Sequence, residues 1–149
     1  MKLRMALGAA AVLALLALAM AGCAQTYHLS VEPTGAALDA VAADRLAAST
    51  DISALASVTT TDAPAMRTSV LAQLRTQGAF GQRAADLLTA GFPARTASVP
   101  VLVRGATFAG TDAVVVVEAW GSSGGKLVHR RLWVFDRVTG QMLRASSFR

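Results

Sequence analysis

The order of two hydrophobic periods is the feature of this 149-residue chain that most limits its fold. Between residues 62 and 91, apolar side chains recur at the three- and four-residue spacing of helices, whereas residues 99–148 contain short strand-like runs separated by turn residues. Helices followed by consecutive strands predict an α+β layer, in which helical faces cover one side of an antiparallel sheet. We expect two amphipathic helices packed on a C-terminal meander of about four strands.

The helical part divides into two segments, forming a helical hairpin or a single bent helix. Asp62 is placed to cap the first segment, Pro64 suits a first turn, and Gly78 would end it. The second segment ends at Gly91, two residues before Pro93. The apolar faces consist of Met66, Val70, Leu71 and Leu74 in the first segment and Phe80, Ala84, Leu87 and Leu88 in the second.

Four later segments have strand character: 99–104, 113–120, 127–135 and 141–148. Pro100 cannot donate a ladder hydrogen bond, so it suggests an edge strand or a strand start. Four consecutive valines at 114–117 favour a pleated surface. Residues 136–140, Asp-Arg-Val-Thr-Gly, predict a hairpin loop that an Asp opens and a Gly with positive φ closes. This hairpin is similar in pattern to the terminal hairpin of PepSY-type domains.

The N-terminus reads as a signal peptide over residues 1–22. Lys2 and Arg4 form a basic start, an uncharged apolar stretch follows, and small residues lead to Cys23. The segment Met20-Ala21-Gly22-Cys23 resembles the lipobox of bacterial lipoprotein precursors, with Met20 where leucine is most usual. The resemblance implies cleavage between Gly22 and Cys23 and acylation of the Cys23 thiol, which would anchor the protein stably if it carries two or more chains. Simple secretion and an uncleaved spanning helix are the alternatives.

Removal of 22 of the 149 residues leaves 127, enough for one domain with a real core. Residues 23–62 are rich in Ala, Ser, Thr and Asp, which predicts a largely flexible tether with a short helix over 36–48, for which Thr34 would be the N-cap. The α+β domain would then occupy 63–149. Because Cys23 is the only cysteine, the domain has no intramolecular disulfide and must fold on packing alone.

Charge on the mature chain is modest and uneven. Residues 100–149 carry seven Lys and Arg against three acids, whereas residues 23–99 carry five Arg against six acids. A basic surface favours anionic headgroups or envelope polymers. Nucleic acid is not expected as a partner, because an exported chain seldom meets it. The alternative is an ordinary mixed-charge surface.

No constellation of residues points to catalysis, a metal or a cofactor. Ser122 and Ser123 lie in a glycine-rich turn without a nucleophile motif, and His28 and His129 are about a hundred positions apart. Glu118 and Asp136 are interpreted as a solvent-facing strand residue and a turn opener. The glycine-rich stretches lack a phosphate-binding pattern.

The most distinctive surface candidate combines arginine with tryptophan. Its residues are Lys126, Arg130, Arg131 and Trp133, of which Arg131 and Trp133 share one strand face and Arg130 lies on the other. Such a set could bind a protein or an anion through stacking and bidentate contacts. The alternative, which we favour, is that the aromatic residues fill the core between sheet and helices or shield an open sheet face, while the arginines extend outward.

The sequence therefore predicts a non-enzymatic lipoprotein. It would be held on the exported face of the cell membrane and bind an envelope protein or an anionic component there. A carrier of an apolar small ligand, held between helices and sheet, is the second hypothesis. A cell-envelope hydrolase is the third.

Overall fold

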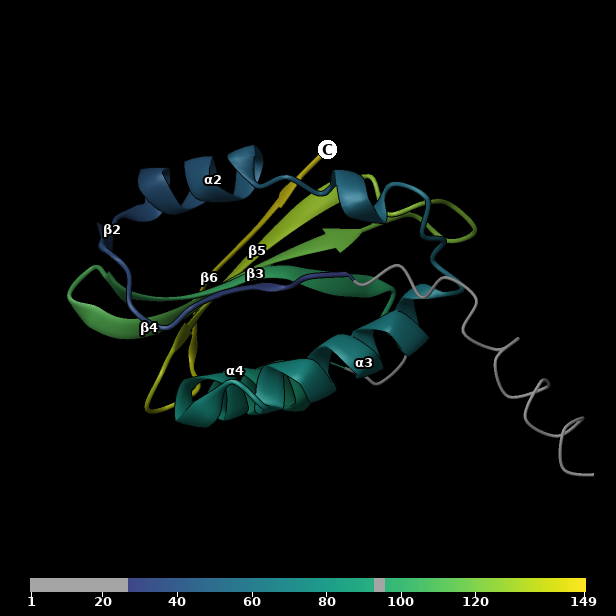
Figure 1. The fold of residues 1–149 in the computed structure, drawn as a ribbon. Coiled ribbons are helices and arrows are strands. Elements are labelled where there is room, and N and C mark those ends of the chain that lie inside the picture. Colours follow the sequence, from purple (N-terminus) through teal and green to yellow (C-terminus); the bar gives the residue numbers. More distant parts are fainter. Residues whose placement is uncertain (1–26, 93–95) are drawn as a thin grey trace, which may run out of the picture.

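The computed structural model describes residues 27–92 and 96–149 (Figure 1). The helices are α2 (Ala40–Ser49), α3 (Ala63–Arg75) and α4 (Gly78–Gly91), with a 3-10 turn, η1, at Ser53–Leu55. The strands are β1 (Ser30–Glu32), β2 (Ala37–Leu38), β3 (Ser98–Phe108), β4 (Thr111–Trp120), β5 (His129–Asp136) and β6 (Met142–Phe148). Strands β3 to β6 form the predicted antiparallel meander, so the α+β class is confirmed.

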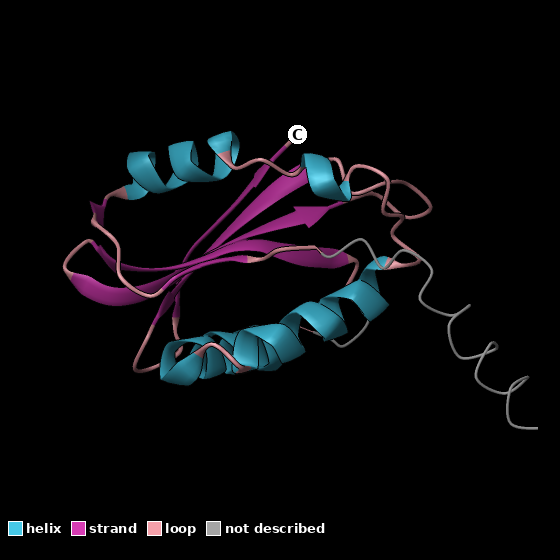
Figure 2. Cartoon of the chain, in the orientation of Figure 1, coloured by secondary structure: helices cyan, strands magenta, loops and turns pink. Residues whose placement is uncertain are grey.

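A single mixed sheet runs through the middle of the domain. Its order is β1-β3-β4-β5-β6, and both β1 and β2 pair in parallel with β3. Helix α2 lies over one face, while α3 and α4 lie over the other (Figures 1 and 2). The sheet is therefore a central layer, whereas the sequence predicted helices on one side only.

The largest correction concerns residues 23–62, which we expected to be a largely flexible tether. From Ser30 onward this segment contributes β1, β2, α2 and η1 to the fold. Gly105 of β3 allows the segment to cross closely, since a Cβ there would lie 2.1 Å from the carbonyl oxygen of Pro33. The short helix begins later than predicted and is capped by Asp39, whose carboxylate accepts from the Ala42 N–H at 2.7 Å, rather than by Thr34. The described domain therefore begins well before residue 63.

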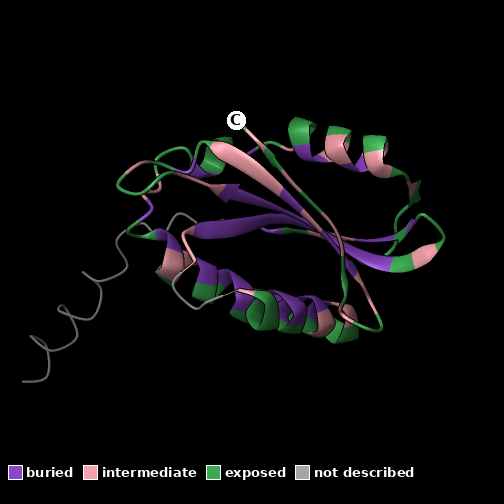
Figure 3. Ribbon diagram, turned by 180° about the vertical axis from the view of Figure 1, so that it is seen from behind, coloured by how far each residue is buried: buried purple, intermediate pink, exposed green. Residues whose placement is uncertain are grey.

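Burial on both faces explains the run of valines in β4. Residues 113–117 are all buried, although successive strand residues point to opposite sides (Figure 3). A strand covered on both faces has a continuous apolar sequence instead of an alternating one. The fully buried side chains on either side of the sheet include Leu55 of η1, Leu74 of α3 and Leu88 of α4.

The predicted turns and boundaries hold with small changes. Pro100 lies in β3 ahead of the part paired with β1 and beside a register irregularity, where a missing N–H is tolerated. Its carbonyl accepts the Tyr27 hydroxyl at 2.8 Å, and burial raises the pKa of that phenol. Asp136 accepts from two loop N–H groups and Gly140 has φ of 77°, as the hairpin requires. Asp62 precedes α3 but accepts from Thr59 Oγ1 rather than capping the helix.

Candidate functional site

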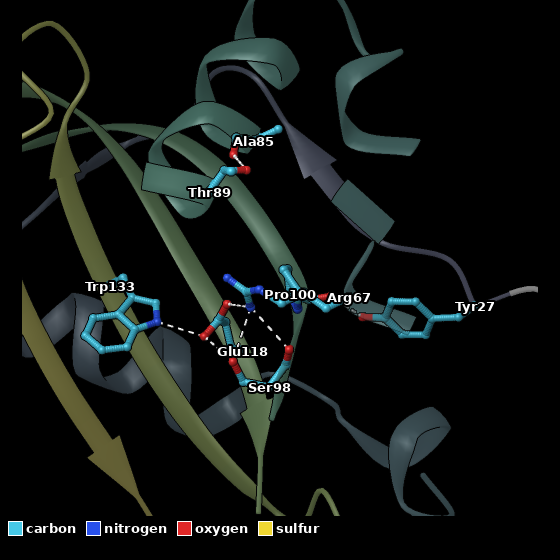
Figure 4. Close-up of polar contacts among 8 residues, drawn as sticks. All are labelled: Tyr27, Arg67, Ala85, Thr89, Ser98, Pro100, Glu118 and Trp133. Carbon is cyan, nitrogen blue, oxygen red and sulfur yellow. Dashed lines mark hydrogen bonds and ion pairs between the residues drawn. The ribbon is translucent and has the colours of Figure 1, made fainter. Parts of the chain in front are cut away.

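A buried ion pair joins α3 to the sheet. Arg67 of α3 and Glu118 of β4 contact each other directly, with only 3% and 0% of their side chains exposed (Figure 4). Arg67 falls in the apolar stripe that also contains Val70, Leu71 and Leu74, so the helix directs it at the sheet. A buried charge is tolerated only when it is paired and hydrogen-bonded.

Further hydrogen bonds complete the environment of the Glu118 carboxylate. Its Oε2 accepts from Ser98 Oγ and from Trp133 Nε1, each at 2.9 Å, while its Oε1 faces the Arg67 Nη1. Arg67 Nη1 also lies 3.2 Å from both the carbonyl oxygen and the hydroxyl of Ser98. This set, Arg67, Ser98, Glu118 and Trp133, is the buried polar cluster. It connects α3 with three adjacent strands.

One buried hydrogen-bond donor of the cluster is unsatisfied by the described residues. Within the described ranges, the buried Nη2 of Arg67 has no hydrogen-bond partner. An unsatisfied buried donor of this kind is uncommon and costs on the order of 1–3 kcal/mol or more when it is charged. The ring of Phe92, just past α4, lies over the guanidinium with its centroid 5.6 Å from Cζ and also contacts Trp133 at 4.6 Å between centroids.

Arg67 also lines an open cleft between α3 and α4. The α3–α4 cleft has a volume of about 290 Å³ and is lined by Arg67, Thr68, Leu71, Arg75, Leu88, Thr89 and Phe92. Leu71, Leu88 and Phe92 supply apolar walls. Arg75 donates to Thr89 Oγ1 at 3.1 Å and lies 3.8 Å from Asp86. A small apolar space with a few polar groups is the usual composition of a ligand site.

The predicted arginine and tryptophan surface is divided in the structure. Arg131 lies over Trp120 and Trp133, with Cζ 4.7 and 5.4 Å from the ring centroids. Arg130, on the opposite face, donates to the Thr50 carbonyl at 2.7 Å, and Lys126 lies in a loop bridged to Thr59. The four residues therefore do not form one patch, and Trp133 is held partly buried by Glu118.

Glu118 is the clearest error of the sequence interpretation. It was taken as solvent-facing, yet it is fully buried because α3 and α4 cover that face. Arg67 and Ser98 were not singled out at all. The sequence did contain a signal for this ion pair. One acid lies inside the apolar run 113–120, and one arginine lies inside an apolar helical stripe. Because each buried charge needs a partner of opposite sign, the two could have been predicted to pair.

The remaining predicted sites are placed as follows. Gly22 and Cys23, the predicted cleavage and lipidation site, lie outside the described residues. His28 is exposed, and the ring of His129 contacts that of Trp120 in a tilted arrangement, with 5.0 Å between ring centroids. Among the residues that the structure describes, no group of three His, Cys, Asp or Glu could hold a metal ion, and no helix has the length and hydropathy needed to cross a bilayer.

Comparison with known proteins adds no assignment. No protein family model, no curated protein and no solved structure matches this chain. The function must be argued from the geometry of the buried polar cluster and the α3–α4 cleft.

Proposed function

We propose that this chain is an exported lipoprotein, anchored to the membrane through Cys23, and that its domain binds a small amphipathic molecule in the α3–α4 cleft. The composition of the cleft carries the proposal. Apolar walls from both helices meet side chains with N–H donors, and one of those donors, Arg67 Nη2, lacks a partner among the described residues. Such a site favours the hypothesis of a small-ligand carrier over the hypothesis of a module that binds a partner through the arginine and tryptophan residues of β5.

Binding without chemistry is supported by the state of the nearest acid. Both oxygens of Glu118 are occupied by Arg67, Ser98 and Trp133, and the side chain is inaccessible to solvent. A general acid or base must reach the proton that it transfers. Asp86, the nearest acid on the helices, is exposed and lies beside Arg75. The cluster therefore supports a role for Glu118 in positioning Arg67 rather than in proton transfer.

The test uses a variant that fills the cleft. Thr68→Trp places a large ring in the cleft from an exposed position of α3, while Ser69→Trp puts the same ring on an exposed neighbour that does not line it. Binding of octanoate, octan-1-ol and octylamine to the mature protein is followed by saturation-transfer and amide NMR. We expect at least one probe to shift amides of 67–75 and 88–92 in the parent and in Ser69→Trp, but not in Thr68→Trp.

Two results would refute the binding function. One is that none of the three probes perturbs the cleft. The other is that Thr68→Trp binds as well as Ser69→Trp, since binding would then occur elsewhere on the molecule.

A further inference from the structure

We infer that the cleft selects an organic carboxylate, whose head group reaches Arg67 Nη2 and Arg75 while its apolar body lies against Leu71 and Leu88. The inference rests on the proposed function, because it names the ligand class of that same site. The inference is based on the charge of the side chains that line the cleft, on their unpaired hydrogen-bond donors, and on the volume of the cleft.

The charged side chains that line the cleft are all of one sign. Among the described residues, Arg67 and Arg75 line it, and no acid does. Glu118 balances the charge of Arg67 from inside the core, so the excess positive charge comes from Arg75. The contact of Arg75 with Asp86 is long, at 3.8 Å, and those side chains are 44% and 65% exposed. Exposed pairs of this kind are weak, and Arg75 Nη2 also donates to Thr89 Oγ1, so the other N–H groups of the Arg75 guanidinium remain available to an anion.

The free hydrogen-bond donors of the described lining are N–H groups of Arg67 and Arg75. The Thr68 and Thr89 hydroxyls donate to the carbonyls of Pro64 and Ala85, at 3.0 and 2.7 Å, so each presents only its oxygen lone pairs, and the Thr89 oxygen accepts from Arg75 Nη2 at 3.1 Å. Arg67 Nη2 has no described partner. A ligand that accepts from two guanidinium groups fits this arrangement, and guanidinium-to-carboxylate bonds are among the strongest in proteins.

Space limits the rest of the ligand. A volume of about 290 Å³ is just below the roughly 300–1,000 Å³ range of ligand pockets. Leu71 and Leu88 form the apolar part, and Phe92 lines this space while its ring centroid lies 5.6 Å from the guanidinium carbon of Arg67, whose Nη2 is buried. A short alkyl or aryl chain ending in a carboxylate matches these dimensions, and access to Nη2 requires Phe92 to turn aside.

The experiment compares three chains of equal length with different heads. Octanoate, octan-1-ol and octylamine are titrated into the mature protein by calorimetry. We expect octanoate to bind about tenfold or more tightly than the alcohol, since one charge-assisted hydrogen bond is worth about that factor. Octylamine should bind most weakly.

Variants of the two arginines locate the selectivity. Arg67→Lys keeps a cation for Glu118 but removes Nη2, and Arg75→Gln removes the cation at the cleft without touching the buried polar cluster. Each should reduce octanoate affinity severalfold and leave the alcohol nearly unchanged, with the Arg75 contribution weakening in salt.

The outcomes separate the two proposals. Equal binding of octanoate and octan-1-ol, or octanoate affinity unchanged in Arg75→Gln and in folded Arg67→Lys, would overturn the carboxylate inference and leave the cleft as a binding site. Failure of all three probes would overturn the proposed function and the inference with it. If Arg67→Lys does not fold, Arg75→Gln decides the question alone.

Discussion

At the scale of single residues, Arg67 and Glu118 determine how α3 sits on the sheet. Removing two charges from water is expensive, and their attraction offsets that cost only when geometry and further hydrogen bonds are favourable. Here Ser98 and Trp133 supply those bonds. An apolar pair of equal volume could stabilise the fold equally well. The charged pair is better explained by position, because the Glu118 carboxylate holds the Arg67 guanidinium at the cleft.

Glu118→Gln removes the counter-charge of Arg67 while keeping the shape of the side chain. We expect it to lower the free energy of unfolding by about 3–5 kcal/mol, because it leaves an uncompensated buried cation. Asp112→Asn is the matched control, since the Asp112–Arg137 pair is also direct, at 2.9 Å, but its side chains are 53% and 40% exposed. The control should cost less than about 1 kcal/mol. Urea unfolding of both variants measures the difference, and equal costs would contradict the role of burial.

The same residues show where sequence reasoning stops. The strand that contains Glu118 was predicted with nearly its observed bounds, because four adjacent valines define it. Its exposure was not predicted, because a sheet covered on one side leaves every second residue in solvent, whereas this sheet is covered on both. The valines at 114–117 contained that information, since one exposed face would have required polar alternation.

At the scale of elements, the short helix predicted over 36–48 is observed as α2, but the sequence interpretation placed it in a tether rather than in the packed domain. Its apolar face is made largely of alanine, and Ala43 and Ala47 are its buried residues. Small side chains give a weak periodic signal, and the composition of the surrounding segment resembles that of a linker. What holds α2 is tertiary: Asp44 accepts from Arg144 Nε at 2.9 Å and from its Nη2 at 2.5 Å, a contact across 100 residues of sequence with β6.

This contact between α2 and β6 predicts a pH dependence. The hydrogen bond from Arg144, followed by its charge, holds the pKa of Asp44 below its ordinary value of 3.8. A carboxyl whose pKa is lower in the folded state stabilises the fold above its unfolded pKa, and that contribution is lost as the pH falls through the folded value. The stability difference between the parent and Asp44→Asn should therefore be constant above about pH 5 and shrink below about pH 4.

Urea midpoints measured from pH 7 down to acid conditions check this expectation. Asp51 and Asp136 also have lowered pKa values, caused mainly by backbone N–H groups, so the parent curve alone cannot isolate Asp44. Repeating the comparison in an Arg144→Gln background provides the control, because Asp44→Asn should then have little effect at any pH. A difference that persists undiminished in strong acid would show that Asp44 acts through packing rather than charge.

At the scale of the whole molecule, the ordered segment from Ser30 changes what an anchor at Cys23 would do. With a tether through residue 62, the domain would have been free to sample a large volume. The described structure instead begins at Tyr27, whose hydroxyl is bonded to β3. Tyr27 lies four positions after Cys23, and four fully extended residue steps span at most about 14 Å. An acylated Cys23 would therefore hold this end of the sheet close to the bilayer surface.

The tryptophans report this proximity, because Trp120 pairs in register with Ser98, at the same end of the sheet as Tyr27. In membranes that contain a dansyl-labelled lipid, energy transfer from tryptophan should be efficient for the acylated protein. It should fall when a twenty-residue Gly-Ser linker is inserted after Ala24, since a flexible linker of that length extends on the order of 25 Å.

Cys23→Ser should abolish both membrane partition and energy transfer. The intact mass of the extracted parent should exceed the mass of the unmodified chain that begins at Cys23 by the mass of the acyl groups. A parent mass without acyl chains, or unchanged partition of Cys23→Ser, would refute the anchor, whereas transfer that is insensitive to the linker would refute the close placement alone.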